Sequence, residues 1–351
     1  MHRLIESLRS VADRTDPPPP ADVADAMAAA ITAMEESADD VRPRDGRGRP
    51  GGLVRLEPRV PCVVVPDVHA RADLVLAVLA MHVPEAADRG SDRSPGSESV
   101  IDALDAGRVQ LVFVGDYVHA EGRARRRWFA AFDEYQGGFD RHDAMDREMA
   151  ESLNTLEIVA RLKAAFPQTV HALKGNHENI ANEERDGNMP FGKFVYEGAM
   201  VAEYMDLFYQ GAAFDAVYRF EKTLPLIAVG GFYIVGHAEP ERFYAVDEVV
   251  GYRDRPEVVR GLTWTANDEA EPDSVTRMLD AYLPRVACEQ RVYLGGHRPV
   301  RGRYHLRAGG SYVQIHNPDR SIVAILDRPP FDPERDVVEV PPIARGPEET
   351  D

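Results

Sequence analysis

The sequence predicts an α/β fold in which two β-sheets pack against each other and helices cover their outer faces. In the first part of the chain, short β-branched runs alternate with helical patterns, which gives the order βαβα. In the later part, the predicted strands lie close together in the sequence. Because each sheet must bury its apolar face, two stacked sheets flanked by helices are the expected arrangement.

Strand and helix patterns alternate from residue 60 onward. Val60–Pro66 (VPCVVVP) is a buried-strand run, and the following Leu74–Met81 has the apolar periodicity of a helix. Val109–Gly115 repeats the strand pattern and ends in GD. Between Met145 and Leu162, apolar residues recur at every third or fourth position, which predicts an amphipathic helix. Further strands are predicted at 169–174, 226–236, 291–295, 304–315 and 321–326.

Three parts of the chain differ in composition. Residues 1–57 are expected to form a helical extension, in which two helical patches flank the run PPPP at Pro17–Pro20. The glycine- and arginine-rich stretch Arg42–Gly52 predicts a flexible linker at the end of this extension. Residues 58–328 are expected to form the main domain, and residues 329–351 a proline-rich, acidic tail.

Charge and cysteine content restrict the class of protein. The net charge of −18 argues against a nucleic-acid partner and against a membrane-binding surface, because both need a positive face. The two cysteines, Cys62 and Cys288, lie far apart and suit a reducing cytosol. The first residues lack the apolar core of a signal peptide, and the longest apolar run, Leu226–Val235, is too short to span a bilayer. We therefore expect a cytoplasmic protein that does not bind membranes.

Polar residues follow five of the apolar runs at the point where each predicted strand ends. From Asp116 onward these positions recur at intervals of 60, 61 and 60 residues (116 to 176, 176 to 237, 237 to 297). Side chains at the ends of neighbouring strands converge in space, and mixed oxygen and imidazole ligands suit manganese, iron or zinc. The five motifs are PDVH (Asp67, His69), GD (Asp116), GNHE (Asn176, His177, Glu178), GHAEP (His237) and GGH (His297).

In this order, the motifs resemble those of the calcineurin-like metallophosphoesterases. The resemblance covers about residues 58–328 and is closest to the bacterial members of the phosphoprotein phosphatase (Ser/Thr) branch. Two weaker similarities support that branch: LPLIAVGGFYIVGHAEP (Leu224–Pro240) and LTWTAND (Leu262–Asp268). The resemblance implies an αββα sandwich, two mixed β-sheets flanked by helices.

The resemblance also implies a dinuclear metal site. Its two divalent ions, for which Mn²⁺ is expected and Fe or Zn are alternatives, would activate a bridging hydroxide and hold the phosphoryl oxygens. His177 is similar to the residue that donates a proton to the leaving oxygen in this family. The implied ligands are Asp67, His69 and Asp116 for the first metal, and Asp116, which bridges, with Asn176, His237 and His297 for the second.

The sequence departs from the family immediately after GDYV. Where the family continues GDxxDRG, this chain has His119, Ala120 and Glu121. The missing acid would pair with His177, and the missing arginine would bind the substrate phosphate. Our favoured hypothesis is relocation, in which His119 or Glu121 orients His177 and Arg123 binds the phosphate. The alternatives are a substrate that needs no arginine at this place, or a protein that binds a phosphorylated ligand without cleaving it.

The expected activity is metal-dependent hydrolysis of phosphate monoesters. The branch resemblance implies phosphoserine or phosphothreonine in proteins as the substrate. A hydrolase of small phosphorylated molecules or dinucleoside polyphosphates is the first alternative. A non-catalytic phospholigand-binding or scaffold protein, with residues 1–57 as its partner arm, is an alternative of another class. The sequence does not determine the oligomeric state.

Overall fold

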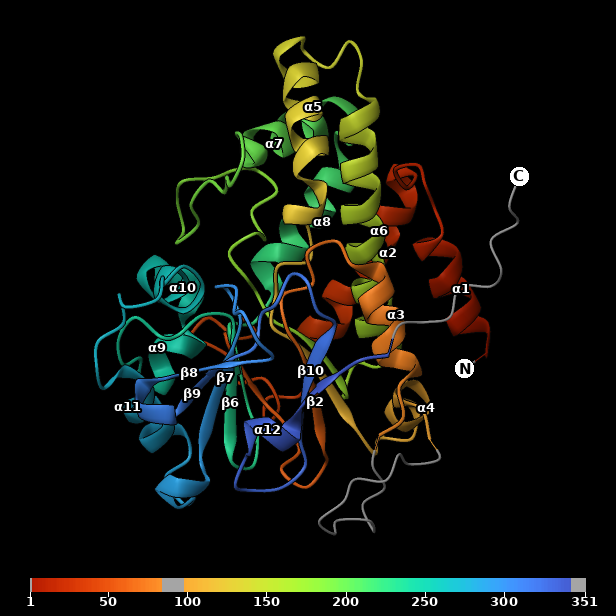
Figure 1. Ribbon diagram of the computed structural model, residues 1–351. Coiled ribbons are helices and arrows are strands. Elements are labelled where there is room, and N and C mark those ends of the chain that lie inside the picture. Colours follow the sequence, from red (N-terminus) through yellow and green to blue (C-terminus); the bar gives the residue numbers. More distant parts are fainter. Residues whose placement is uncertain (1, 84–97, 342–351) are drawn as a thin grey trace.

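Two mixed β-sheets lie at the centre of the protein in a computed structural model that describes residues 2–83 and 98–341 (Figure 1). One sheet has five strands in the order β11-β10-β2-β3-β4, and the other has six in the order β1-β5-β6-β7-β9-β8. Helices cover both outer faces. The predicted fold class, an α/β sandwich of two mixed sheets flanked by helices, is confirmed.

The five-stranded sheet has a parallel centre and an antiparallel edge. β2 pairs parallel with β3, and β3 pairs parallel with β4, whereas β10 pairs antiparallel with both β2 and β11. The centre is parallel because helices join its strands, as the βαβ order in the sequence predicts. The strands are β2 (Cys62–Val65), β3 (Gln110–Phe113), β4 (Val170–Ala172), β10 (Ile322–Leu326) and β11 (Val337–Glu339).

The six-stranded sheet is built mainly from the later part of the chain. β6, β7 and β9 are parallel to one another, and β5 and β8 pair antiparallel with β6 and β9. β1, the sheet's one early strand, pairs parallel with β5 at the edge. The strands are β1 (Leu53–Arg55), β5 (Ile227–Val229), β6 (Tyr233–Gly236), β7 (Val292–Gly295), β8 (His305–Arg307) and β9 (Tyr312–Gln314).

Alternation along the strands divides their side chains between two apolar layers. In β2, Val63 and Val65 face the helices, whereas Val64 joins Val112, Val235 and Leu294 in the layer between the sheets. This alternation has the period of two expected of β-structure. Because both faces of the central strands are covered, their sequences are apolar throughout, as in the run CVVV.

Helices from the first two thirds of the chain pack together on the side of the five-stranded sheet, some of them on other helices beyond the strands, and a smaller group covers the six-stranded sheet (Figure 1). Of the described helices, none is both long and apolar enough to cross a membrane. The first group is α1 (His2–Ala12), α2 (Pro20–Glu35), α3 (Ala72–Ala80), α4 (Val100–Asp105), α5 (Arg125–Gln136), α6 (Asp143–Ala165), α7 (Glu197–Phe208) and α8 (Ala212–Thr223). The second is α9 (Val246–Val250), α10 (Pro256–Thr263) and α11 (Ser274–Tyr282); the short α12 (Pro333–Asp336) precedes β11.

The residues before 58, predicted as an extension, contribute to this same architecture. Met27 and Ile31 of α2 are buried in the core that includes α6 and α8, and β1 is a strand of the six-stranded sheet. The predicted linker folds around Arg42, whose buried guanidinium donates to the carbonyl oxygens of Gly51 and Thr223 at 2.8 and 2.5 Å. Of the predicted tail, residues 342–351 lie outside the described residues, and Val337–Glu339 forms β11.

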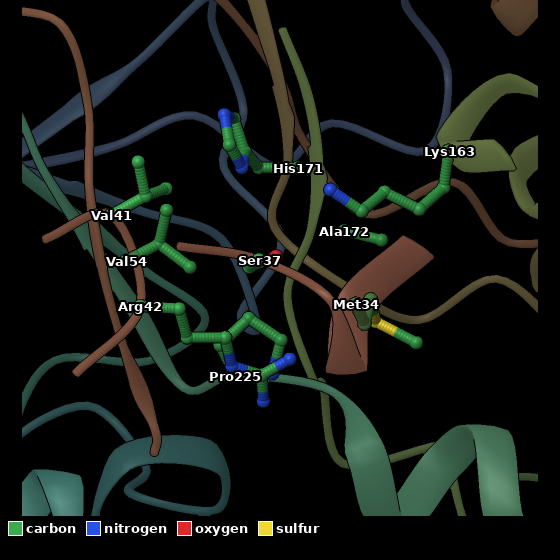
Figure 2. Close-up of a pocket in the computed structure, with 9 residues that line it drawn as sticks. All are labelled: Met34, Ser37, Val41, Arg42, Val54, Lys163, His171, Ala172 and Pro225. Atoms are coloured by element: carbon green, nitrogen blue, oxygen red, sulfur yellow. The ribbon is translucent and has the colours of Figure 1, made fainter. Parts of the chain in front are cut away.

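A small cavity lies at the end of α2, where it is lined by three side chains of basic residues (Figure 2). Arg42, Lys163 and His171 all line it, beside apolar residues such as Val54. Burial lowers the pKa of Lys163 to about 7 and that of His171 to about 3. The cavity holds about 10 Å³, enough for roughly one water molecule, and none of the predicted metal ligands lines it.

Candidate metal centre

The predicted ligands all lie just beyond the carboxyl ends of parallel strands. Because parallel strands present these ends at one edge of a sheet, residues remote in sequence meet there. Asp67 and His69 follow β2, Asp116 follows β3 and Asn176 follows β4. His237 follows β6 and His297 follows β7 in the other sheet.

Asp116 lies at the centre of the cluster. Its Oδ2 is 3.5 Å from Nε2 of His69 and 3.6 Å from Nε2 of His237. Nδ1 of His237 is in turn 3.5 Å from Oδ1 of Asp67, so this histidine lies between both aspartates. Ligand atoms of Asp67, Asp116 and His237 all lie within 4.8 Å of one another. A carboxylate with imidazoles on two sides can bridge two ions.

Asn176 connects His297 to this group through His237. Its Oδ1 lies 2.9 Å from Nε2 of His237 and 2.9 Å from Nδ1 of His297. The backbone N–H of His297 also donates to Oδ1 of Asp67 at 2.9 Å. The structure therefore brings all six predicted ligands into one connected cluster.

Unusual backbone conformations turn these side chains toward one another. His69, Asp116 and His297 have φ angles of 45°, 52° and 64°, in the left-handed region that side chains other than glycine rarely adopt. Such conformations persist where the surrounding structure imposes them, and they concentrate at functional sites. Glu178 imposes one of them: its carboxylate accepts from the backbone N–H groups of Asp116 and Gly175 at 2.9 and 2.6 Å.

The electrostatics of the cluster fit divalent metal ions. Burial lowers the pKa of His69, His237 and His297 to about 3 each, so these imidazoles are neutral at physiological pH, which is the form that binds metals. Burial raises the pKa of Asp116, and the nearby carboxylates of Asp67 and Glu178 raise it further. Metal cations bound between these carboxylates would offset the repulsion among their negative charges. Oδ2 of Asp67 and Nε2 of His297 are buried and have no hydrogen-bond partner among the described residues.

His177 lies at the side of the cluster. Its side chain is 15% exposed, and its Nε2 is 3.9 Å from Oδ2 of Asp116. The ring of His119 stacks on the ring of His177 with centroids 4.7 Å apart. Nε2 of His119 is 3.7 Å from a carboxylate oxygen of Glu197, which is itself fully buried. His119 is thus placed between His177 and an acid, although no hydrogen bond joins the two rings.

Comparison with solved structures supports the fold. A protein serine/threonine phosphatase from Saccharomyces cerevisiae, described as similar to human phosphatase PP5, matches with a TM-score of 0.55 at 14% identity, over 94% of this chain and 92% of that one. The two chains share a fold. A cold-active protein-tyrosine phosphatase of Shewanella reaches a TM-score of 0.40 at 12% identity, over 78% of each chain. No protein-family model matches the sequence, and no curated protein sequence matches it significantly.

One residue of the cluster escaped the sequence analysis. His316, which lies in none of the five motifs, is fully buried, and its Nδ1 lies 3.5 Å from Oδ2 of Asp67. Its ring centroid is 5.2 Å from that of His69. The signal was available, since His316 follows strand β9 just as the other ligands follow theirs. Applying the strand-end rule to QIHN would have found it.

Glu121, one of the residues that depart from the family pattern, faces the same side of the cluster. Its Oε2 is 3.1 Å from Nε2 of His316, and its Oε1 is 3.8 Å from Nε2 of His69. Lys193 donates to Oε1 at 2.9 Å. Glu121 is therefore next to His69 and His316, whereas His119 is next to His177.

Arg123 lies beside the loop that carries His69. Its guanidinium donates to the carboxylate of Glu151 at 2.5 Å and to the carbonyl oxygens of His69 and Ala70 at 3.3 and 3.0 Å. Its side chain is 41% exposed, so part of the guanidinium is accessible. These contacts brace the loop that carries His69, and the predicted contact with a substrate phosphate stays a prediction.

Proposed function

We propose that this protein is a metallophosphoesterase that hydrolyses phosphate monoesters, with phosphoserine and phosphothreonine in proteins as its substrates. The observation that carries the proposal is the cluster around Asp116, in which oxygen and imidazole donors from both sheets converge on a central carboxylate. We assign the protein to the bacterial phosphoprotein phosphatase branch, on the motifs that its sequence shares with that branch.

Two divalent metal ions, Mn²⁺ in the first instance and Fe or Zn as alternatives, are the proposed cofactors. When bound, such a pair activates a water molecule as the nucleophile and stabilises the charge on the phosphoryl oxygens. Asp67, His69 and Asp116 would hold the first ion. Asp116 would bridge to the second, which Asn176, His237 and His297 would hold.

His177 is proposed to protonate the leaving oxygen. It is the one partly exposed histidine among His69, His119 and His177, and its Nε2 lies 3.9 Å from Asp116. Burial and the neighbouring imidazoles lower the pKa of His177 well below the ordinary value. A dianionic phosphate beside the ring would favour the charged form and raise this pKa again. Stacking on His119 would hold the ring in place for the transfer.

The proposed partner is a phosphorylated protein in the cytoplasm, not a nucleic acid or a membrane. The net charge of −18 supports this choice, because an extended polyanion would be repelled by most of the surface. A single phosphate group can still bind where metal ions reverse the local charge.

A small phosphorylated molecule, such as a dinucleoside polyphosphate, is the second candidate substrate. The observation that favours it is Ala120, which stands where the family that the motifs resemble has its phosphate-binding arginine. A site without that arginine fits a substrate whose phosphate does not require an arginine at this position. A protein that binds phosphorylated ligands without turnover is the alternative of another class.

The test combines metal analysis with activity. The purified protein is expected to contain about two metal ions per chain and to release nitrophenol from mono-nitrophenyl phosphate in a Mn²⁺-dependent reaction, with little release from bis-nitrophenyl phosphate. Asp116→Asn should abolish both, whereas Asp105→Asn, at the exposed end of α4, should leave both unchanged.

Absence of both metal and turnover would overturn the enzyme proposal. Metal binding without turnover would favour the non-catalytic alternative. A panel of phosphopeptides and dinucleoside polyphosphates then separates the two substrate classes.

A further inference from the structure

His316 meets the first-metal ligands from the opposite sheet. Donor atoms of Asp67, His69 and His316 all lie within 4.8 Å of one another, and all three residues are buried. Nδ1 of His316 and Oδ2 of Asp67 face each other at 3.5 Å, and neither atom has a hydrogen-bond partner among the described residues.

The distance between these two atoms suits a shared ion better than a hydrogen bond. An N–H···O bond is about 2.9–3.0 Å long, which is shorter than 3.5 Å. Two ligand atoms that each lie about 2.1 Å from one ion are separated by roughly 3–3.5 Å. Two buried polar atoms aimed at the same point therefore form half of a coordination shell.

The other nitrogen of His316 is held by a carboxylate. Nε2 of His316 is 3.1 Å from Oε2 of Glu121, whose other oxygen accepts from Lys193 at 2.9 Å. Because one oxygen of this carboxylate is paired with the ammonium group of Lys193, the other oxygen faces His316 as an acceptor. An accepting carboxylate oxygen requires a proton on Nε2, which leaves the lone pair of Nδ1 directed at Asp67.

We propose that His316 is a ligand of the first metal, together with Asp67, His69 and Asp116, and that Glu121 and Lys193 are positioning residues that fix its tautomer. A carboxylate behind a ligating histidine is a common arrangement in metal sites, where it orients the ring and increases its basicity. This inference rests on the proposed two-metal function. It gives Glu121 a role on the metal side of the site.

The experiment measures metal binding directly. Metal-free protein is titrated with Mn²⁺ by equilibrium dialysis, and Co²⁺-loaded protein gives a visible absorption spectrum that reports the ligands. His316→Ala is expected to lower the affinity for one of the two ions by at least about 10–100-fold and to change the Co²⁺ spectrum. Glu121→Gln should lower the affinity for the same ion by a smaller factor. His305→Ala, an exposed histidine on β8, is the matched control and should bind both ions as the wild type does.

Several outcomes would overturn the inference. If His316→Ala binds both ions with wild-type affinity and an unchanged Co²⁺ spectrum, His316 is not a ligand. If Glu121→Gln leaves the affinity unchanged, the positioning role is wrong. If His316→Ala fails to fold, as judged by near-UV circular dichroism of the metal-free protein, His316→Gln is measured instead and decides the question in the same way. A wild type without any metal would contradict the proposed function itself, which separates the two failures.

Discussion

Nε2 of His316 lies 3.1 Å from Oε2 of Glu121, although 195 positions of sequence separate the two residues. The contact joins the loop after β9 to the loop after β3 and thus links the two sheets at the candidate metal centre. It also shows what one of the residues after GDYV contacts, at the place where the sequence departs from the family that it resembles. Glu121 faces His69 and His316, and His119 stacks on His177.

Gly296 is expected to be essential for the position of Asp67. A Cβ atom at residue 296 would lie 1.8 Å from Oδ2 and 2.7 Å from Cγ of Asp67, so Gly296→Ala must displace this carboxylate. A displacement of about 1 Å at a catalytic group can cost roughly 100-fold in rate. We expect Gly296→Ala to lose the first metal and at least about 100-fold in kcat/KM.

Gly302→Ala is the control for this substitution, because the new Cβ would lie 3.9 Å from the carbonyl oxygen of Tyr304, an ordinary contact distance. Metal content by elemental analysis and kcat/KM for nitrophenyl phosphate are measured for both variants. Wild-type metal content and activity in Gly296→Ala would show that Asp67 is not required in its present place.

The buried amine of Lys163 is expected to make stability depend on pH. Burial lowers its pKa to about 7, against 10.5 in the unfolded chain, so between these values the unfolded state binds more protons. Stability therefore rises with pH in this window, by up to about 1.4 kcal/mol per pH unit, and this contribution is lost as the pH falls toward 7. Urea unfolding between pH 7.5 and 10 measures the slope.

Lys163→Met should remove this rise. The substitution also deletes hydrogen bonds to the carbonyl oxygens of Pro167 and Val170, which shifts the whole curve but not its slope. The difference between wild type and variant isolates Lys163, because tyrosines and cysteines titrate in both proteins. Parallel curves over the window would contradict the expected low pKa.

The sequence predicts most of the candidate site because a strand and its ligand are adjacent in the chain. The runs ending at Val65, Phe113 and Gly236 are apolar enough to be recognised as buried strands, and Asp67, Asp116 and His237 follow within a few residues. His316 was overlooked although it obeys the same rule, since QIHN resembles none of the family's motifs. Its partner Glu121 is 195 positions away, and no local pattern encodes such a pairing.

Other parts of the fold depend on contacts that are remote in sequence. β1 has only three residues and becomes a strand because β5 lies beside it. Arg42 is buried because it bonds to the carbonyl of Thr223, 181 positions away. The single strands predicted at 226–236 and 304–315 are each two antiparallel strands, and in the second pair the turn contains Gly309 with φ of 65°. The glycine pair at 309 and 310 was the local signal for that turn.

Arg123 is predicted to contribute to binding of the substrate phosphate. We expect Arg123→Ala to lower kcat/KM for phosphate monoesters by at least about tenfold, or ~1.4 kcal/mol. Because Arg123 also donates to the carbonyl oxygens of His69 and Ala70, an effect through the metal loop has to be separated from a direct one. Loss of inhibition by inorganic phosphate at unchanged Mn²⁺ affinity identifies direct contact.

Arg126→Ala, which removes an exposed arginine of α5, is the matched control for Arg123 and should behave as the wild type. Unchanged kcat/KM in Arg123→Ala would reject the phosphate role. If a fall in Mn²⁺ affinity accounts for the whole loss of kcat/KM, Arg123 acts by supporting the loop that carries His69.

His177 is predicted to act as the general acid, which makes its effect depend on the leaving group. General acid catalysis contributes about 10²–10⁴-fold where the leaving oxygen needs a proton. We expect His177→Asn to lose this factor with phenyl phosphate and with a phosphoserine peptide. The loss should be much smaller with nitrophenyl phosphate, because nitrophenolate leaves readily without a proton.

The substitution should spare the metal centre, since the backbone N–H of His177, not its ring, donates to Asp116 at 2.9 Å. Metal content is therefore the control, and it should match the wild type. His119→Ala, which removes the stacked ring, should reduce the rate with phenyl phosphate less than His177→Asn does and in the same leaving-group order. Equal losses for phenyl and nitrophenyl phosphate in His177→Asn would mean that this histidine does not deliver the proton. The residue would then act by binding the phosphoryl group, and its neighbour His119 would have no part in proton transfer.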